Sequence, residues 1–194
     1  MTTAPKALDF QVTLQHVEPP IWRRIRLPAA ASMWDLHVAI QDAMGWFDCH
    51  LHQFIVGDPR DGHFIGIPTD MDPDEIEPGW EVPMQEIFTE VGSKVVYEYD
   101  FGDGWTHVVE LVDQVTTGRA IRKPRCLAGE RACPPEDCGG PYGYPDLLAA
   151  LRDPSHPEHE AMVEWAPAGF DPEHFDAKVV KFDDPAARLR RMVR

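Results

Sequence analysis

The chain has 194 residues, of which 43% are hydrophobic and 26% are charged, and its formal net charge is −15. This length suits one domain, residues 1–194, with a sizeable core, rather than two small independent domains. The sequence contains no apolar run that approaches a membrane span, and so negative a charge disfavours a protein that grips nucleic acid through its phosphates.

The first third of the chain, residues 8–67, predicts a sheet with one helix packed across it. The start of the chain, "MTTAPKALDFQ", lacks the charged and apolar regions of a secretory signal, so we expect a cytoplasmic protein. Alternating apolar residues predict strands at 8–17, 21–27, 51–57 and 63–67. Ser32 and Asp35 form a capping box that begins a helix, which Gly45 ends. The order β-β-α-β-β predicts an α+β fold with an antiparallel or mixed sheet in a β-grasp-like arrangement.

The rest of the chain predicts a central hairpin, a long loop and short helices. In chain order we expect an acidic loop (68–82), a short helix (84–92), a hairpin (94–116) with strands 94–101 and 105–116, and an ordered Pro- and Gly-rich loop (118–143). The C-terminal part, 144–193, predicts four short helices, at 144–153, 156–165, 171–180 and 185–193.

The hairpin sequence "YEYDFGDGWTHVVE" has two interpretations. A two-residue Asp-Gly turn at Asp103 sets Asp100 opposite His107, where a carboxylate would fix the tautomer of the ring. A three-residue loop would instead set Tyr99 opposite His107, because a slip of one residue changes which side chains meet. A structural role, in which Asp100 pairs with His107 or bonds the turn amides, is favoured over a binding site.

Two other stretches carry side chains suited to binding a ligand. In "CHLHQF", His50 and His52 stand two residues apart at the start of a strand, so alternation points both to one face, as in a metal-binding pair. In "CPPEDCGGPYGY", prolines and glycines frame Glu136 and Asp137 in a rigid loop that suits a divalent metal, another cation or a peptide amine. A structural loop, which caps the next helix or satisfies buried backbone amides, accounts for the same residues and is favoured. His37, on a polar stripe of the first helix, is a further candidate site residue, although a hydrogen-bonded structural role is favoured for it.

The four cysteines, Cys49, Cys126, Cys133 and Cys138, form no C-x-x-C pair. A reducing compartment argues against disulfides between them. The spacing of Cys126, Cys133 and Cys138 is not that of a common zinc motif, so a structural zinc held by these three and one histidine is a subordinate hypothesis.

Six stretches of the chain together point to a known family. They are "PPIWRRI" (19–25), "LHVAIQDAMGW" (36–46), "HLHQF" (50–54), "YEYDFGDGWTH" (97–107), "CLAGERACPPEDCGG" (126–140) and "FDPEHFD" (170–176). In this order they resemble the family named after the third open reading frame of an agrobacterial Ri plasmid. Some members are labelled TnpR-type passenger proteins of insertion elements. The resemblance implies an α+β domain in a prokaryotic protein associated with plasmids or mobile elements, and it implies no particular activity.

The recombinase label does not fit the residues of this chain. A serine resolvase needs a nucleophilic serine among arginines, whereas Ser32 and Ser155 suit helix caps and Ser93 follows a glycine that ends a helix. Tyr97 and Tyr99 lie in an expected strand without a matching set of Arg and His. We therefore expect the label to reflect genomic neighbourhood, and we assign no catalytic residue.

The sequence favours a non-catalytic module for protein interaction or ligand binding. We expect it to bind a protein or peptide partner through an aromatic and acidic surface around Trp46, His50, Trp105 and the loop 133–140. Nucleic acid is expected to bind, if at all, only through the Arg-rich tail 188–194.

The alternative function is that of a metal-dependent hydrolase or metal-binding protein. A divalent metal, the one cofactor that the sequence suggests, would draw its ligands from His50, His52, Asp100, Asp103, His107, Glu136 and Asp137. The first set of ligands to consider is His50, His52 and His107. This hypothesis requires side chains from three distant segments to meet at one point.

Overall fold

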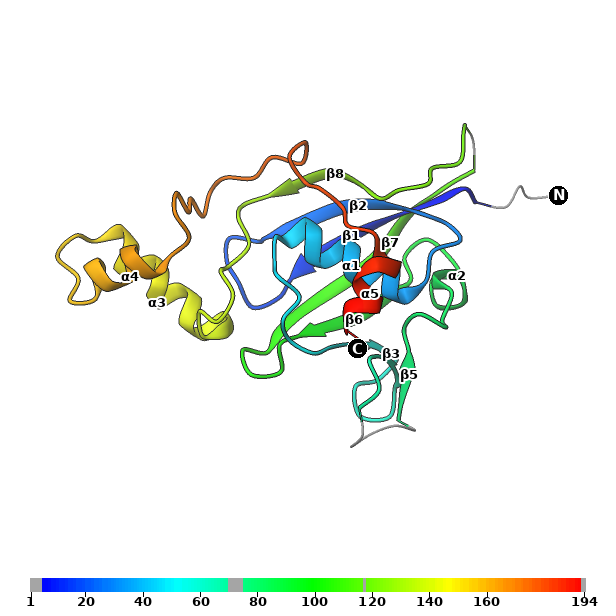
Figure 1. Cartoon of the computed structure of the whole chain (residues 1–194), viewed down its shortest axis with the longest axis horizontal. Helices are drawn as coiled ribbons and strands as arrows, with labels where there is room; N and C mark the ends of the chain where they lie inside the picture. Colours follow the sequence, from blue (N-terminus) through cyan, green and yellow to red (C-terminus); the bar gives the residue numbers. More distant parts are fainter. Residues whose placement is uncertain (1–4, 70–74, 117, 193–194) are drawn as a thin grey trace.

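Eight strands and five helices make up the computed structural model of the chain, which describes residues 5–69, 75–116 and 118–192 (Figure 1). The strands are β1 (Ala7–Leu14), β2 (Trp22–Pro28), β3 (His52–Val56), β4 (His63–Gly66), β5 (Ile76–Pro78), β6 (Lys94–Tyr99), β7 (Trp105–Val115) and β8 (Arg125–Glu130). The helices are α1 (Met33–Met44), α2 (Met84–Ile87), α3 (Gly140–Arg152), α4 (His159–Trp165) and α5 (Pro185–Met192). Within the described ranges, no helix has the length and apolar character that crossing a membrane requires.

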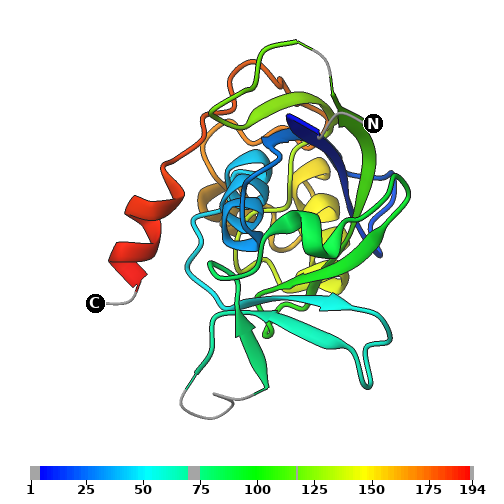
Figure 2. The same cartoon turned by 90° about the vertical axis from the view of Figure 1, so that its right-hand side faces the viewer.

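All eight strands join in one mixed sheet, in the order β5-β4-β3-β6-β7-β1-β2-β8. Neighbouring strands are antiparallel except β4 and β5, which are parallel. The sheet curves around α1 and α3, and α5 lies outside the curve (Figure 2). The expected α+β class with a mixed sheet is confirmed. The hairpin of β6 and β7 lies between β3 and β1, so the expected β-grasp-like arrangement is not confirmed.

The local signals for helix α1 act as the sequence predicts. Ser32 Oγ accepts a hydrogen bond from the backbone N–H of Asp35, and Asp35 Oδ2 accepts one from the N–H of Ser32, at 3.2 and 2.7 Å. Gly45 ends the helix with a φ of 90°, a conformation that glycine adopts without a steric penalty. The capping box and the terminal glycine therefore fix both ends of α1.

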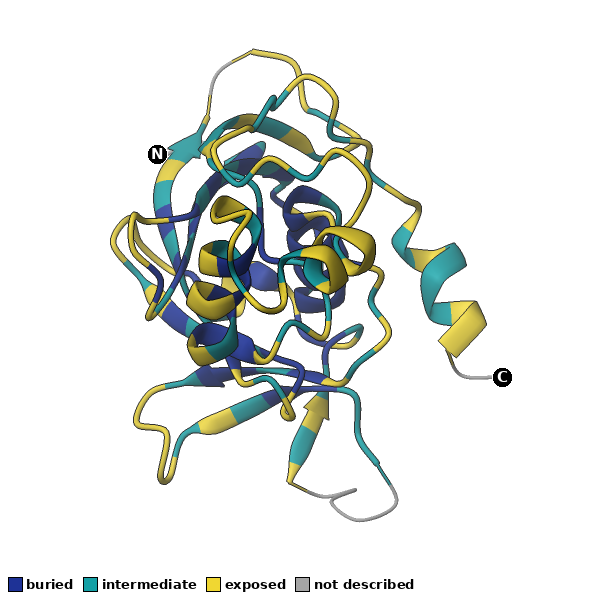
Figure 3. Ribbon diagram, turned by 90° about the vertical axis from the view of Figure 1, so that its left-hand side faces the viewer, coloured by how far each residue is buried: buried dark blue, intermediate teal, exposed yellow. Residues whose placement is uncertain are grey.

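Helix α1 is largely buried, as its dark blue colour in Figure 3 shows. His37 and Gln41, which the sequence places on a polar stripe, are 0% exposed. Gln41 Nε2 donates a hydrogen bond to the hydroxyl of Tyr97 at 2.9 Å, and His37 Nδ1 lies 2.9 Å from the same oxygen. Polar side chains are tolerated in a core where they find such partners. The bonds of His37 agree with the structural role expected for it.

The hairpin of β6 and β7 has neither of the two registers that the sequence suggests. Tyr97 lies opposite His107, and Tyr99 lies opposite Trp105. The loop therefore spans residues 100–104, and Asp100 does not face His107.

The side chain of Asp100 explains this longer loop. Asp100 has a φ of 55°, and its Oδ1 accepts hydrogen bonds from the backbone N–H groups of Gly102 and Asp103 at 3.0 and 3.3 Å. An aspartate that bonds its own turn in this way competes with strand pairing. Strand β6 therefore ends at Tyr99, and Phe101, expected in the strand, is 53% exposed.

Two strands lie in segments that the sequence predicts as loops. Strand β8 lies within 118–143 and pairs with β2, and β5 lies within 68–82 and pairs with β4. Residues 70–74 of the expected acidic loop lie outside the described residues. Both strands are at the edges of the sheet. Their partners are distant in sequence or parallel, so local residue patterns do not reveal the pairing.

The described C-terminal part has three helices rather than the four expected. Residues 171–180 form turns instead of a helix, and there the ring of Phe175 lies against the guanidinium group of Arg23, 3.7 Å from ring centroid to carbon. Helix α3 begins at Gly140, earlier than predicted. Asp184 caps α5, because its Oδ1 accepts hydrogen bonds from two backbone N–H groups at 3.0 and 3.3 Å.

Candidate functional site

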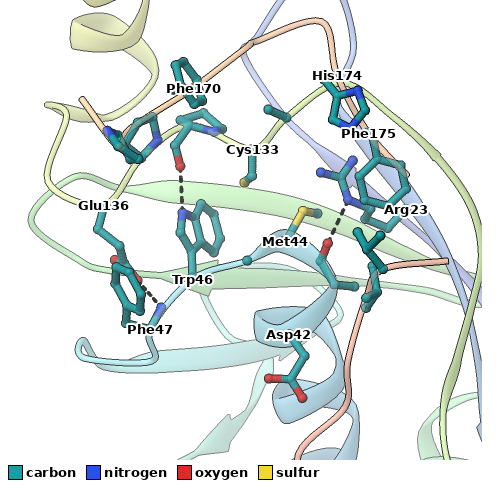
Figure 4. Close-up of a pocket in the computed structure, with 18 of the residues that line it drawn as sticks. Arg23, Asp42, Met44, Trp46, Phe47, Cys133, Glu136, Phe170, His174 and Phe175 are labelled. Atoms are coloured by element: carbon teal, nitrogen blue, oxygen red, sulfur yellow. Dashed lines mark hydrogen bonds between the residues drawn. The ribbon is translucent and has the colours of Figure 1, made fainter. Parts of the chain in front are cut away.

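A cavity of about 850 Å³ lies beside the C-terminal end of α1 (Figure 4). Its walls come from residues 42–49, the loop 132–137 and the C-terminal segment 165–181, with Arg23 from β2. The volume is in the range of sites that hold a small molecule or a few side chains. Three segments far apart in sequence thus enclose this hollow.

Aromatic side chains form much of the cavity wall. Trp46 is 6% exposed, its Nε1 donates a hydrogen bond to the carbonyl oxygen of Pro134 at 2.9 Å, and its ring stacks on Tyr99 with centroids 5.0 Å apart. Phe47, the next residue, is 82% exposed. The sequence predicts Trp46 and Trp105 on an exposed surface, but Trp105 is 1% exposed and Trp46 faces the cavity, so the surface at this place differs from the expected one.

Arg23 closes one side of the cavity and is almost fully buried. Its Nε donates a hydrogen bond to the carbonyl oxygen of Ala43, and its Nη1 donates to the carbonyl oxygens of Trp22 and Glu130, at 2.8 to 2.9 Å. Burial lowers the pKa of Arg23, which still stays charged at neutral pH. Arg23 is not among the site residues that the sequence predicts. Strand alternation could have identified it, because Arg23 lies two residues before Ile25 and on the same buried face of β2.

Beside the cavity, one imidazole nitrogen faces three carboxylates. His50 Nε2 lies 3.2 Å from Asp137 Oδ1, 3.5 Å from Asp100 Oδ2 and 3.8 Å from Glu136 Oε2. The nitrogen is shielded from solvent, and it makes no hydrogen bond with the described part of the chain. Glu136 and Asp137 also line the cavity. Four of the residues expected at a site thus meet, from the stretch before β3, the loop after β6 and the loop before α3.

Hydrogen bonds hold two of these carboxylates in place. Glu136 Oε1 accepts hydrogen bonds from the backbone N–H of Phe47 at 2.7 Å and from the hydroxyl of Tyr99 at 3.1 Å. Burial and the charge of Glu136 raise the pKa of Tyr99 far above its usual value, so its hydroxyl keeps its proton and donates. The side chains of Asp100 and Glu136 are 8% and 9% exposed. The two groups are therefore fixed before any ligand arrives.

His52 does not join His50, although the sequence predicts both on one face. Strand β3 begins at His52, so His50 precedes the strand and strand alternation does not apply to it. The ring of His52 stacks on His37, with centroids 3.4 Å apart, and His37 Nε2 lies 2.9 Å from Asp48 Oδ1. Burial lowers the pKa of both histidines. His37, Asp48 and His52 form a separate buried group in which the rings stay neutral.

His107 also lies away from the carboxylates. It is 0% exposed, its Nδ1 lies 3.4 Å from the carbonyl oxygen of Tyr97, and its ring meets the edge of Trp46 with centroids 5.4 Å apart. Asp103 uses its Oδ2 to accept a hydrogen bond from the N–H of Gly139 at 3.2 Å. The ligand set His50, His52 and His107 therefore does not converge within the described residues.

We expect His107 to make the protein less stable as the pH falls. Burial lowers its pKa to about 3, whereas a histidine in the unfolded chain titrates near 6.5. Between these values the unfolded state binds the extra proton, so stability is lost with falling pH, by up to about 1.4 kcal/mol per pH unit. From pH 7 to pH 5, wild type should lose about 2 kcal/mol more than H107F in urea unfolding. Equal losses in the two proteins would contradict this account of His107.

Three of the cysteines, Cys126, Cys133 and Cys138, belong to no group of potential metal ligands within the described residues. All four are free, and none of the groups of three or more potential ligands lying within 4.8 Å of one another contains Cys126, Cys133 or Cys138. Burial raises the pKa of all three thiols, that of Cys138 to about 12. Because these thiols do not converge with other potential ligands, the structure offers no support for the zinc hypothesis at these residues.

Similarity to known proteins covers nearly the whole chain. A family model described as plasmid pRiA4b ORF-3-like protein matches residues 6–179. An uncharacterized protein of Sinorhizobium fredii (strain NBRC 101917 / NGR234), y4hQ, is 34% identical over 95% of both chains. The crystal structure of a protein of unknown function from Methanosarcina mazei Go1, MM3350, matches with a TM-score of 0.82 and 36% identity, covering 93% of this chain and 100% of that one. The chain belongs to the plasmid pRiA4b ORF-3-like family.

Proposed function

We propose that the chain is a non-catalytic binding module, whose cavity takes an aromatic or branched aliphatic side chain of a protein or peptide partner. The observation that carries this proposal is the cavity of about 850 Å³ with Trp46, Phe170 and Phe175 in its wall. Large apolar hollows with a few fixed polar groups are the usual place for a ligand. Trp46 is held by Pro134 and by Tyr99, so the wall is in place before a partner binds.

Acidic residues at one end of the cavity suggest the charge of the partner residues that flank the inserted side chain. Glu136 and Asp137 line this end, and the side chain of Asp137 is 69% exposed. With a net charge of −15, the whole chain attracts a basic partner over a longer range. We therefore propose a partner segment with a Lys or Arg close to its apolar residue.

Phe47 offers a test that leaves the core intact. Peptides would be selected from a random display library on the wild-type protein, and their affinities measured for F47A and Y142A. Both residues are exposed aromatics, at 82% and 90%, but only Phe47 lines the cavity. F47A should weaken binding about tenfold or more, as truncation of a central interface aromatic does. Y142A should bind as wild type does.

The selected peptides themselves provide a second measurement. They should share an apolar residue near a Lys or Arg, and their affinity should fall as salt is raised. Two results would refute the proposal: no enrichment over an unrelated acidic protein, or equal affinity for wild type and F47A. Equal melting temperatures of F47A and wild type would show that the loss of binding is not a loss of folding.

A further inference from the structure

The geometry points to a binding site for one first-row divalent metal ion, such as Zn²⁺ or Mn²⁺, at His50, Asp100 and Asp137. The ligand atoms are His50 Nε2, Asp100 Oδ2 and Asp137 Oδ1, all within 4.8 Å of one another. Glu136 stands beside them as a further carboxylate. The site shares Asp137 with the carboxylates proposed to attract a basic residue of the partner, but it needs no group from outside the chain.

The distances from His50 Nε2 to two of these oxygens are close to those of ligands that share one ion. Zinc binds nitrogen and carboxylate oxygen at about 2.0–2.2 Å, which in a tetrahedral site sets two ligand atoms roughly 3.3–3.6 Å apart. His50 Nε2 lies 3.2 Å from one carboxylate oxygen and 3.5 Å from another. A hydrogen bond would be the ordinary explanation of such distances, but this nitrogen makes none with the described residues. A shielded nitrogen without a hydrogen bond, aimed between carboxylates, is what a metal ion would satisfy.

Hydrogen bonds from neighbouring backbone groups hold the proposed ligand Asp100 in place, as such bonds do around known metal ligands. Asp100 Oδ1 is held by two backbone N–H groups, which leaves Oδ2 on the side of His50. The N–H of Asp100 donates to the carbonyl oxygen of Leu51 at 2.9 Å and so ties the loop to the stretch that carries His50. Outer hydrogen bonds of this kind orient ligands and raise metal affinity.

The excess negative charge around His50 also favours the binding of a cation. Three carboxylates surround one imidazole, and among the ion pairs of the described residues none brings a Lys or Arg to them. A divalent ion would neutralise most of this excess. A nitrogen ligand with oxygens suits zinc and manganese better than magnesium, which prefers oxygen alone. The side chains of His50 and Asp137 are 29% and 69% exposed, so an ion can enter from solvent.

The test is a titration of chelator-treated protein with Zn²⁺, followed by calorimetry. Wild type should bind one equivalent, and H50Q and D137N should each bind at least tenfold more weakly. Asp137 has a φ of 57°, which Asn tolerates well, so D137N removes charge without straining the loop. The control is H63Q, because His63 Nε2 faces a single carboxylate, Glu77, and both side chains are 47% exposed. H63Q should bind zinc as wild type does.

A second measurement separates a built site from loose attraction of ions to an acidic surface. Added Mn²⁺ should broaden the ring resonances of His50 at ratios well below one equivalent and leave those of His63 unchanged. The proposal is overturned if wild type shows no saturable binding, if H50Q and D137N bind as wild type does, or if H63Q loses as much affinity as H50Q. The first of these results would indicate that His50 contacts the carboxylates directly, without a metal ion between them.

Discussion

Replacing Gly140 with alanine is expected to lower the free energy of unfolding by about 2–5 kcal/mol. A β-carbon at this position would lie 2.1 Å from the carbonyl oxygen of Asp103, and Gly140 has a φ of 68°. The strain of a left-handed alanine accounts for about 1–2 kcal/mol, and the rest comes from pushing two backbone segments apart. Urea unfolding of both proteins measures the difference.

The control for this substitution is G92A. Gly92 has a φ of 96°, but a β-carbon there would meet no atom within 4 Å. G92A should therefore show only the backbone strain, about 1 kcal/mol. A loss in G140A no larger than that in G92A would show that the two loops are not in close contact at Gly140.

Gly140 matters because it joins the two loops that build the candidate site. The loop 100–104 carries Asp100, and the loop before α3 carries Glu136 and Asp137. The N–H of Gly139 donates to Asp103 Oδ2 at the same junction. If zinc binds as proposed, G140A should also lower the affinity for zinc, since the substitution would move the carboxylates apart.

Features that depend on neighbouring residues were predictable from the sequence. The capping box of α1, its terminal glycine and the cap of α5 each involve groups within a few residues of one another. The existence of the β6–β7 hairpin follows from alternation around a Gly-rich turn. Its register does not, because two hydrogen bonds that the side chain of Asp100 accepts from the turn decide where β6 ends.

The meeting of His50 with its carboxylates was not predictable in the same way. The sequence identified His50, Asp100, Glu136 and Asp137 as candidates, since His and acidic residues in rigid turns often bind ligands. It also included His52 and His107, which the fold buries elsewhere. Which candidates converge depends on long-range packing of three loops, and residue spacing contains no information on that.

The contacts of the Arg-rich tail were also not predictable from the sequence. The sequence suggests it as the one place for a polyanion, but Arg188 turns inward and its side chain is only 12% exposed. Its Nη2 lies 2.6 Å from Asp42 Oδ1 and 2.8 Å from Asp183 Oδ2, and its Nη1 lies 3.4 Å from Asp48 Oδ2. Residues 193–194 of the tail lie outside the described part of the chain. Arg188 is thus engaged in holding α5 against α1.

We expect R188A to lower the free energy of unfolding by about 3 kcal/mol or more. The side chains of Asp42 and Asp48 are 8% and 3% exposed, so the substitution would leave two buried carboxylates without their cation. The matched control is R191A on the same helix, because the Arg191 side chain is 68% exposed and its Nη2 lies 3.5 Å from Asp183 Oδ2. R191A should change stability by about 0.5 kcal/mol or less.

A double-mutant cycle with D48N tests whether charge is the cause. Burial acts to raise the pKa of Asp48, but the hydrogen bond and charge of His37, together with the charge of Arg188, lower it below its usual value. Asp48 has a φ of 59°, which Asn also tolerates, and Asn keeps an oxygen for His37. D48N should therefore cost much less in R188A than in wild type, with a coupling of about 1 kcal/mol or more. Additive effects would mean that the charge of Asp48 is not coupled to Arg188, and the loss in R188A would then come from its other contacts, such as that with Asp42.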